Sequence, residues 1–453
     1  MKVHFISIGG SAMHNLAIAL KLKGYNVTGS DDQIFEPSSS RLQKYGLMPD
    51  KFGWDRSRIS NNIDFIILGM HAKIDNPELI EAQKKNIKIY SYPEFIYESS
   101  KEKTRIVISG SHGKTSITSI ILHVLKKCEI EVDYLVGAQL SGFETMVHLT
   151  EENEFIIIEG DEYLSSAIDN RPKFHVYQPN IALISGISWD HINVFPSEQV
   201  YHIQFKKFVE TIIDGGVLIY NELDNNVKEI VDSTQKSIKK LGYSYPKYNI
   251  EDGKTFLNTD EGKLPIEIFG KHNLSNLSGA KLVCQMVGIQ EQNFNESLMS
   301  FNGADKRLEP ILNLSDRIIF KDFAHSPSKV AATTDAIKYQ FSDRKLIAVL
   351  ELHTYSSLNK KFIVQYKNSL NKADLKVLFY DPDVVSQKNL DNLDAEFLKL
   401  AFNENDLQIF TDGDELKEFL FNQDYRNTNL VFMSSGNFAS VDLNELIEKI
   451  KIQ

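Results

Sequence analysis

Short apolar runs alternate along the chain with longer stretches in which apolar residues recur every three or four positions. The short runs predict buried β-strands, and the longer stretches predict helices with one apolar face. In the first block, a strand over 3–8 leads through a glycine turn into a helix that carries Leu16 and Leu20 on its apolar face. Gly24 is placed to end this helix, and further strands are predicted around Val27, over 65–68 and over 87–90.

The same alternation continues through the rest of the chain. In the middle block, strands are predicted from 104, within 154–162 and within 181–191, and the DG and EG turns of 247–268 predict a small hairpin layer. In the last block, the predicted strands are Arg317–Lys321, Leu346–Leu350, Leu375–Phe379 and Leu430–Met433.

Continuous apolar runs joined by helices imply parallel sheets that are covered on both faces. We therefore predict an α/β protein of three domains. The first, at 1–103, is Rossmann-like; the second, at 104–308, is a P-loop domain with a central parallel sheet and a small β layer; and the third, at 309–453, is again Rossmann-like.

The overall composition narrows the class of protein. A net charge of −11 over 453 residues argues against a nucleic-acid partner, which needs a basic face. Cys128 and Cys284 lie far apart in apolar helical patterns, which is typical of buried thiols in a reducing compartment. No apolar run approaches the roughly 18 residues of a membrane span, and the chain opens with a strand and no signal peptide. We therefore expect a cytoplasmic protein without a membrane partner.

The stretch 104–126 carries the strongest functional signal. Its apolar strand turns through GSHGKT into an amphipathic helix, although the usual pattern has a glycine where this chain has Ile108. Backbone N–H groups, the positive end of a helix dipole and one lysine together hold a polyphosphate. We assign nucleotide binding to Gly110, Ser111, His112, Gly113, Lys114, Thr115 and Ser116.

Within this turn, Lys114 is predicted to reach the terminal phosphates and Thr115 to hold Mg²⁺. The alternative interpretation is an ordinary glycine turn in which Lys114 faces solvent.

Two other strands of the middle block end in residues that suit this chemistry. Glu159 and His191 each follow an apolar run, and the carboxyl ends of parallel strands share one edge of a sheet. Lys114, Glu159 and His191 are therefore predicted to converge beside a phosphate-bound Mg²⁺, where they would neutralise developing charge. Taken singly, Glu159 would more readily be interpreted as a helix N-cap and His191 as an ordinary loop histidine, but their joint occurrence at strand ends after the P-loop favours the site.

The glycine turn of the first block predicts another nucleotide site. Asp31 follows this turn by about twenty positions, the Rossmann arrangement in which an acidic residue grips a ribose. Ser7 and Ala12 replace the first and last glycines of the dinucleotide fingerprint. NAD is therefore disfavoured, and a different nucleotide is expected.

Several motifs occur in the order in which they stand in the Mur ligases, the ATP-dependent amide-bond-forming enzymes of peptidoglycan assembly. The shared motifs are FISIGGSAM at 5–13, GSHGKT at 110–115, EGDE at 159–162, WDH at 189–191, HNLSN at 272–276, FNGADKRLE at 301–309 and DFAHSP at 322–327. Ser7 departs from the opening motif, and Lys306 stands where the family has an arginine. The chain closely resembles this family over essentially its whole length.

The resemblance implies a ligase that uses ATP and Mg²⁺. The first domain would bind UDP-N-acetylmuramic acid, the second ATP, and the third an amino-acid or peptide acceptor. The carboxylate of the sugar would attack the γ-phosphate of ATP, and an amine would then displace phosphate from the acyl phosphate. Lys114 would stabilise the transferring phosphoryl group, Thr115 and Glu159 would hold one Mg²⁺, and His191 would help to bind a second.

The resemblance also implies contacts for individual residues. ATP would be contacted by His272 and Asn273 at the adenine, by Asn276, by Arg307 at the phosphates and by Asp322 at the ribose across the domain cleft. His325 is a candidate for positioning the nucleophile. The UDP-sugar would be bound by Gly9, Gly10, Ser11, Ser30, Asp31 and His71.

Two segments bear on the acceptor. Segment 159–179 resembles the branch that recycles murein peptides and joins UDP-N-acetylmuramic acid to L-alanyl-γ-D-glutamyl-meso-diaminopimelate. Segment 351–358 resembles neither this branch nor the alanine-adding branch. We predict the tripeptide as acceptor, with free L-alanine as the alternative. Lys206 lies near the carbamylated lysine of other Mur ligases, but alignment on Tyr201 puts Phe205 there, so Lys206 is expected to be an exposed helix lysine.

Two other classes of protein share parts of the pattern. A folylpolyglutamate-type ligase would begin directly at the P-loop, and the nucleotide-binding first domain argues against it. A regulator that senses nucleotide without turnover would not need Lys114, Glu159 and His191 together.

Overall fold

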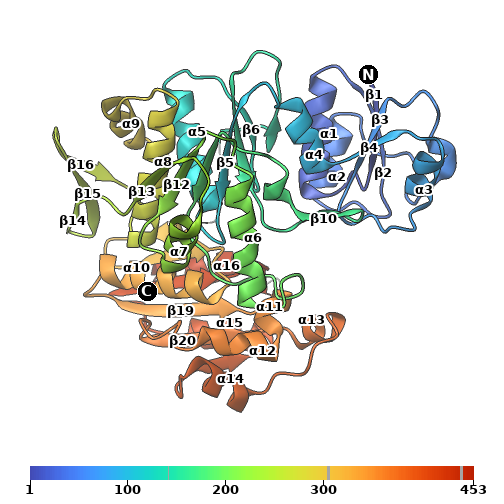
Figure 1. Ribbon diagram of the computed structural model, residues 1–453. Helices are drawn as coiled ribbons and strands as arrows, with labels where there is room; N and C mark the ends of the chain where they lie inside the picture. Colours follow the sequence, from blue (N-terminus) through green and yellow to red (C-terminus); the bar gives the residue numbers. More distant parts are fainter. Residues whose placement is uncertain (141, 302, 304–306, 439–441, 453) are drawn as a thin grey trace. The chain divides into compact units, whose positions relative to one another are not determined.

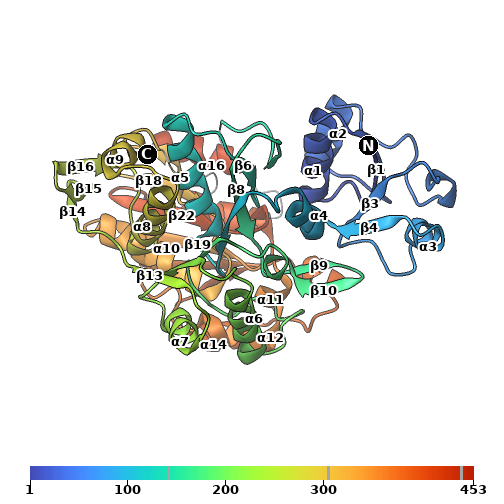
Figure 2. The ribbon, with the colours of Figure 1, turned by 45° about the horizontal axis from the view of Figure 1, so that its top comes forward.

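The computed structural model describes all residues except 141, 302, 304–306, 439–441 and 453. Asn302 and Lys306, two positions of the motif at 301–309, thus lie outside the described residues. In the described chain, helices alternate with strands of five sheets, and the three larger sheets are mainly parallel (Figures 1 and 2). The predicted α/β class is confirmed. The larger sheets fall within 1–103, 104–308 and 309–453, while the exact domain boundaries stay a prediction.

Compact packing divides the chain differently, into two units. The first unit comprises Met1–Ile187, His202–Tyr243 and Gly279–Ile289, and the second comprises Ser188–Tyr201, Ser244–Ser278 and Gln290–Gln453.

The first sheet has the parallel strand order β2-β1-β3-β4. Its elements and covering helices are β1 (Lys2–Ile6), α1 (Ser11–Leu22), β2 (Asn26–Ser30), α2 (Ser38–Lys44), β3 (Phe65–Leu68), α3 (Pro77–Lys84), β4 (Lys88–Ser91) and α4 (Tyr92–Ser99). Helix α1 ends as predicted, since Gly24 follows its C-cap with a φ of 88°. Strand β1 ends two residues before the predicted Ile8, because Ser7 takes a left-handed conformation with a φ of 68°.

A buried carboxylate holds the carboxyl end of β2 in place. Glu78 of α3 is fully buried; its Oε2 accepts a hydrogen bond from Ser30 Oγ and lies 3.3 Å from His4 Nε2. Its Oε1 accepts from the Asp55 N–H at 2.9 Å and from the Arg58 guanidinium at 3.2 Å. Burial tends to raise the pKa of Glu78, but these hydrogen bonds lower it overall, so the carboxylate is charged.

The central sheet has the order β13-β12-β11-β5-β8-β6-β7, and all pairs are parallel except β6 with β7. Its elements are β5 (Thr104–Ser109), α5 (Lys114–Lys127), β6 (Asp133–Leu135), β7 (Val147–His148), β8 (Phe155–Gly160), β11 (Ile181–Ile184), α6 (Glu198–Glu210), β12 (Val217–Asn221), α7 (Asn225–Ser233) and β13 (Lys239–Tyr243). The three predicted strands are confirmed as β5, β8 and β11. Because β5 pairs with both of the others, the turn after it is flanked by the ends of β8 and β11.

Two small antiparallel sheets complete the middle of the chain. The predicted hairpin layer is confirmed as β14 (Tyr248–Glu251), β15 (Lys254–Thr259) and β16 (Gly262–Ile266). A second hairpin, β9 (Leu164–Ser166) with β10 (Asp169–Pro172), was not predicted, because its sequence lacks alternation and its pairing register shifts within β10 (Figure 2). Helices α8 (Lys271–Met286) and α9 (Glu291–Leu298) follow.

The last sheet has the order β17-β18-β22-β19-β20-β21, in which only β17 is antiparallel among the described strands. Its elements are β17 (Glu309–Asn313), β18 (Ile318–Asp322), α10 (Pro327–Gln340), β19 (Lys345–Glu351), α11 (Tyr355–Leu358), α12 (Lys360–Ile363), β20 (Leu375–Phe379), α13 (Pro382–Gln387), α14 (Ala395–Phe402), β21 (Gln408–Phe410), α15 (Gly413–Phe421), β22 (Thr428–Met433) and α16 (Leu443–Ile452). All four predicted strands are confirmed: β20 has the predicted bounds, and the other three differ from theirs by at most two residues.

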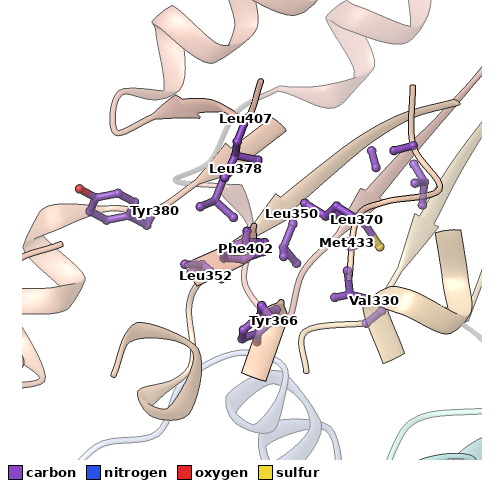
Figure 3. Packing of buried hydrophobic residues seen from close by; sticks show 14 of the residues in the cluster. Val330, Leu350, Leu352, Tyr366, Leu370, Leu378, Tyr380, Phe402, Leu407 and Met433 are labelled. Carbon is purple, nitrogen blue, oxygen red and sulfur yellow. The ribbon is translucent and has the colours of Figure 1, made fainter. Parts of the chain in front are cut away.

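The core on one face of this last sheet is built from both strands and helices. Figure 3 shows Leu350 and Leu378 from the adjacent strands β19 and β20 among the buried side chains of this cluster. Tyr366 and Phe402 stack in the same cluster, with ring centroids 5.1 Å apart. This packing fixes the strands whose carboxyl ends carry the polar residues described below.

The cysteines agree with a further expectation. Cys284 is buried and Cys128 partly buried, neither forms a disulfide, and burial raises the pKa of the Cys284 thiol. Across the residues that the structure describes, no helix combines the length and the apolar character needed to cross a bilayer.

We expect Glu78→Ala to lower the free energy of unfolding by about 3 kcal/mol, because buried donors lose their acceptor. Denaturation by urea, followed by circular dichroism, measures this change. Glu81→Ala is the matched control on the same helix: Glu81 pairs with Lys85 at 3.2 Å nearer the surface. Its effect should stay below about 0.5 kcal/mol. Equal losses in the two variants would contradict the role of the buried network.

Candidate active site

The glycine turn after β5 has a geometry that other residues could not adopt. Gly110 has a φ of 131°, and a Cβ there would lie 2.1 Å from Ser185 Oγ. The residues after β11 brace the turn: Ser185 Oγ donates to the His112 carbonyl, and the Gly186 carbonyl accepts from the Ser111 N–H at 3.0 Å. Helix α5 begins at the end of this turn without a side-chain cap, which leaves N–H groups of its first turn to meet an anion.

Lys114 lies inside this site. Its side chain is 15% exposed, and its Nζ donates to the Gly110 carbonyl and to Glu162 Oε2, both at 2.6 Å. Burial tends to lower the pKa of Lys114, but the charges of Glu162, Asp161 and Glu159 raise it overall. The alternative of a solvent-facing lysine is therefore wrong.

Thr115 and Glu159 also meet. Thr115 Oγ1 donates to Glu159 Oε1 at 2.8 Å, and the Gly137 N–H donates to Glu159 Oε2, also at 2.8 Å. Glu159 lies within β8 and is buried, so it is not a helix N-cap. Lys114, Thr115 and Glu159 thus gather at the carboxyl ends of β5 and β8 within the first unit.

This donor set fits magnesium. A hydroxyl and a carboxylate oxygen are ligands that Mg²⁺ prefers, and it takes only one or two carboxylates when phosphates and waters supply the remainder. No group of three or more His, Cys, Asp or Glu side chains is arranged to hold a metal within the described part of the chain. A nucleotide-dependent Mg²⁺ site does not need such a group.

His191 belongs to the second unit, where it lies beside Asp190. The His191 N–H donates to Asp190 Oδ1 at 2.7 Å. Burial tends to raise the pKa of Asp190, but electrostatic interactions with His191, Lys329 and His325 lower it overall. The structure thus associates His191 with His325, a grouping that sequence reasoning did not predict. The approach of His191 to Lys114 stays a prediction.

His325 is a partly buried, neutral imidazole. Its Nδ1 lies 2.7 Å from the Phe323 carbonyl, to which it donates, and Tyr366 Oη donates to the His325 carbonyl. Burial lowers the pKa of His325 to about 3, and the charge of Lys329 adds to this effect. Because Nδ1 carries the proton, Nε2 presents a lone pair.

Asp322 and Arg307, two of the residues expected at the nucleotide, lie together in the second unit. Asp322 Oδ2 accepts from the Leu308 N–H at 2.5 Å, and its Oδ1 accepts from the Ala324 N–H at 2.6 Å. Burial raises the pKa of Asp322 overall, although the charge of Arg307 opposes this shift. The Arg307 guanidinium carbon lies 4.8 Å from the centre of the Phe323 ring.

The three residues expected near the adenine or elsewhere on ATP lie in the first half of α8. Asn273 Nδ2 donates to the Phe269 carbonyl at 3.1 Å, Asn276 is buried, and His272 is partly exposed.

The expected UDP-sugar residues are only partly gathered. The Gly9 N–H donates to Asp31 Oδ2 at 2.7 Å, and burial raises the pKa of Asp31 to about 6. Gly10 and Ser11 begin α1 beside them, whereas Ser30 gives its hydroxyl to Glu78. His71 is exposed on the turn after β3.

A further polar cluster lies at the carboxyl edge of the last sheet. Glu351 Oε2 accepts from Ser434 Oγ and from the Phe438 N–H at 3.0 Å, and Glu351 Oε1 lies 3.8 Å from His353 Nδ1. No role was predicted from the sequence for Glu351, His353 or Ser434. Their position at the ends of parallel strands was the available signal.

Lys206 and Phe205 lie next to each other on helix α6 but differ in exposure. Lys206 is exposed, as expected, whereas Phe205 is fully buried with its ring centroid 5.3 Å from that of Phe174.

Comparison with known proteins identifies the family. Residues 2–104 match the family model described as "Mur ligase family, catalytic domain", and residues 108–284 match "Mur ligase middle domain". The UDP-N-acetylmuramate–L-alanine ligase of Caldicellulosiruptor bescii is 32% identical over 419 residues, which cover 89% of this chain and 88% of that protein. The chain belongs to the Mur ligase family. This Mur ligase is therefore an ATP-dependent enzyme that forms an amide bond in peptidoglycan synthesis.

Other relatives differ in their acceptor. The Escherichia coli K12 ligase named for L-alanyl-γ-D-glutamyl-meso-2,6-diaminoheptandioate is 28% identical over 361 residues, 78% of this chain and 79% of that protein. The solved UDP-N-acetylmuramate–alanine ligase of Thermotoga maritima superposes with a TM-score of 0.70 at 19% identity, covering 100% of this chain and 99% of that one. This likeness confirms the fold of N-terminal, central and C-terminal domains.

The lowered pKa of His325 predicts a pH dependence of stability. Between pH 6.5 and about 3, the unfolded chain protonates this imidazole while the folded chain does not, so folding stability falls as the pH drops through this window. We expect His325→Asn to remove up to about 1.4 kcal/mol per pH unit from that slope. Urea denaturation of both proteins at several pH values between 6.5 and 4.5 measures it. Identical slopes would show that the folded protein protonates His325 readily.

Proposed function

We propose that this Mur ligase joins UDP-N-acetylmuramic acid to the tripeptide L-alanyl-γ-D-glutamyl-meso-diaminopimelate, using ATP and Mg²⁺. The nucleotide part of the proposal is supported by the turn at 110–115, with Lys114 buried beside Glu162 and Thr115 bonded to Glu159. The acceptor part is supported by segment 159–179, which resembles the peptide-recycling branch, and by the similarity to the E. coli relative.

The chain's own residues suit the first step, in which the muramoyl carboxylate attacks the γ-phosphate and ADP leaves. Lys114 would stabilise the charge that develops on the transferring phosphoryl group. Thr115 and Glu159 would hold one Mg²⁺, with His191 at a second, and the metal would neutralise phosphate charge. Arg307 would contact the phosphates.

Other residues would hold the remainder of ATP. His272 and Asn273 would contact the adenine, Asp322 would bind the ribose, and Asn276 would support this part of the nucleotide site. Asp322 is already fixed by two backbone N–H donors, which suits a residue that must present a carboxylate in one orientation.

In the second step, the amine of the acceptor attacks the acyl phosphate and phosphate leaves. His325 would orient this amine through the lone pair on Nε2. Because its pKa is lowered to about 3, it is a poor base, so the role that fits is positioning and not proton removal.

The UDP-sugar would bind at Gly9, Gly10, Ser11, Ser30, Asp31 and His71. The hydrogen bond from the Gly9 N–H to Asp31 supports this, because it shows that the turn accommodates an anionic oxygen. A diphosphate would exploit the same property.

The alternative acceptor is free L-alanine. The C. bescii relative, which is named for that reaction, favours it. Segment 351–358, which contains Glu351 and His353 of the polar cluster, lies at the carboxyl edge of the last sheet and resembles neither branch.

An assay of ADP release with UDP-N-acetylmuramic acid and each acceptor in turn decides between the two. We expect the tripeptide to give a kcat/KM at least about 100-fold above that of L-alanine, as a site built for a longer polar acceptor should. Efficient turnover with L-alanine alone would overturn the choice of acceptor. Absence of ADP release with both would reject the proposed reaction.

The pairing of Thr115 with Glu159 predicts a difference between two conservative variants. Thr115→Ser keeps the hydroxyl and should retain activity within about threefold, whereas the isosteric Thr115→Val removes it and should lower kcat at least about 100-fold. Steady-state ADP release over a range of Mg²⁺ concentrations measures both. Near-normal activity of Thr115→Val would exclude the hydroxyl as a metal ligand.

A further inference from the structure

Glu162 lies just beyond the end of β8 and was not among the expected site residues. Its side chain is 2% exposed, and its Oε2 lies 2.6 Å from Lys114 Nζ. The neighbouring carboxylate, Asp161, pairs with Lys173 at 2.5 Å. Glu162 is therefore the acidic side chain of this segment that contacts Lys114 directly.

The contacts of Lys114 define a direction. An ammonium group has three N–H donors, and Lys114 gives one to the Gly110 carbonyl and one to Glu162. With two donors fixed, the ammonium cannot rotate, and its third N–H is held in one orientation. A lysine on a flexible four-carbon stem otherwise has no such preference.

Glu162 is better suited to retain Lys114 than to release it when a phosphate binds. Departure of the ammonium would break a 2.6 Å ion pair with a carboxylate that is 2% exposed, and breaking a buried ion pair is unfavourable. If Lys114 stays in place, no contact is lost, because its third N–H can donate to the phosphate while the other two still donate to the Gly110 carbonyl and Glu162.

We propose that Glu162 is a positioning residue of the ATP site, which together with the Gly110 carbonyl orients the third N–H of Lys114 toward the transferring phosphoryl group. This inference rests on the proposed role of Lys114. It extends the site to a residue that acts on the phosphate only through the lysine.

The test compares Glu162→Gln and Glu162→Asp with Asp161→Asn in the full-length enzyme. We expect each Glu162 variant to lower kcat about 10- to 100-fold, since misplacement of a catalytic group by about 1 Å has an effect of this size. The KM for ATP should change less than about threefold, because the lost interaction belongs to the transition state. Asp161→Asn removes a charge one residue away and should keep kcat within about threefold.

A double-mutant cycle separates positioning from a merely structural role. In a Lys114→Met background, Glu162→Gln should cause no further loss of kcat. Additive losses would show that Glu162 acts independently of Lys114. Tighter ATP binding with unchanged kcat in Glu162→Gln would instead show that Glu162 competes with the nucleotide, and it would overturn the proposal.

Two controls complete the experiment. Thermal unfolding of each variant identifies poor folding, and Glu162→Asp, which keeps the charge but is one methylene shorter, gives the answer if Glu162→Gln is unstable. The parent enzyme is assayed beside them with both acceptors. If the parent releases no ADP, the proposed function fails; if the parent is active and the Glu162 variants match it, only the positioning role fails.

Discussion

The site of this Mur ligase depends on one constraint, which is that a buried ammonium must be matched by carboxylates. Lys114 begins α5 in a largely buried position, and an unpaired charge there would be strongly destabilising. The parallel pairing of β5 with β8 meets this need, since its register sets Ile108 opposite Glu159 and Ser109 opposite Gly160. The segment that follows β8 therefore emerges beside the turn that follows β5. Charges separated by more than forty positions in the sequence become neighbours through strand register.

Much of this arrangement could be predicted, because its signals are local. The sequences of β5, β8 and β11 contain more consecutive apolar residues than an exposed segment would. They therefore predicted buried strands that pair in parallel. Gly110 and Gly113 indicated the turn after β5. Because parallel strands end at the same edge of a sheet, Glu159 was predicted to lie near Lys114 and Thr115. These features follow either from the spacing of apolar residues within a segment or from the common direction of the strands in a parallel sheet.

The remainder depends on contacts that no local pattern encodes. Glu162 and Asp161 are adjacent acids, and only their side-chain directions decide that one contacts Lys114 and the other Lys173. The association of Asp190 with His325 joins residues far apart in the chain, so neither sequence segment signals it alone. Strand β17 was missed for a similar reason, since it is an antiparallel edge strand whose pairing with β18 shifts register at Pro310.

Left-handed backbone conformations occur in the segments that carry candidate site residues. Four residues other than glycine adopt them within or near these segments, although this conformation costs about 1–2 kcal/mol for a residue with a Cβ. They are Ser7 with φ 68°, His191 with φ 56°, Leu308 with φ 50° and Phe438 with φ 52°. The backbone N–H of each donates to an oxygen. Ser7 donates to the Ser30 carbonyl and His191 to Asp190 Oδ1, while Leu308 donates to Asp322 Oδ2 and Phe438 to Glu351 Oε2.

The oxygens that hold these strained residues are themselves fixed. Asp322 and Glu351 end parallel strands most of whose other residues are buried in the core of the last sheet. The strain is therefore offset by hydrogen bonds to acceptors that cannot move away, and the backbone at the sheet edges is held in shape before any substrate arrives. Such a preset edge suits an enzyme that must orient a phosphoryl group and an amine in succession, because little ordering is left to occur at the moment of reaction.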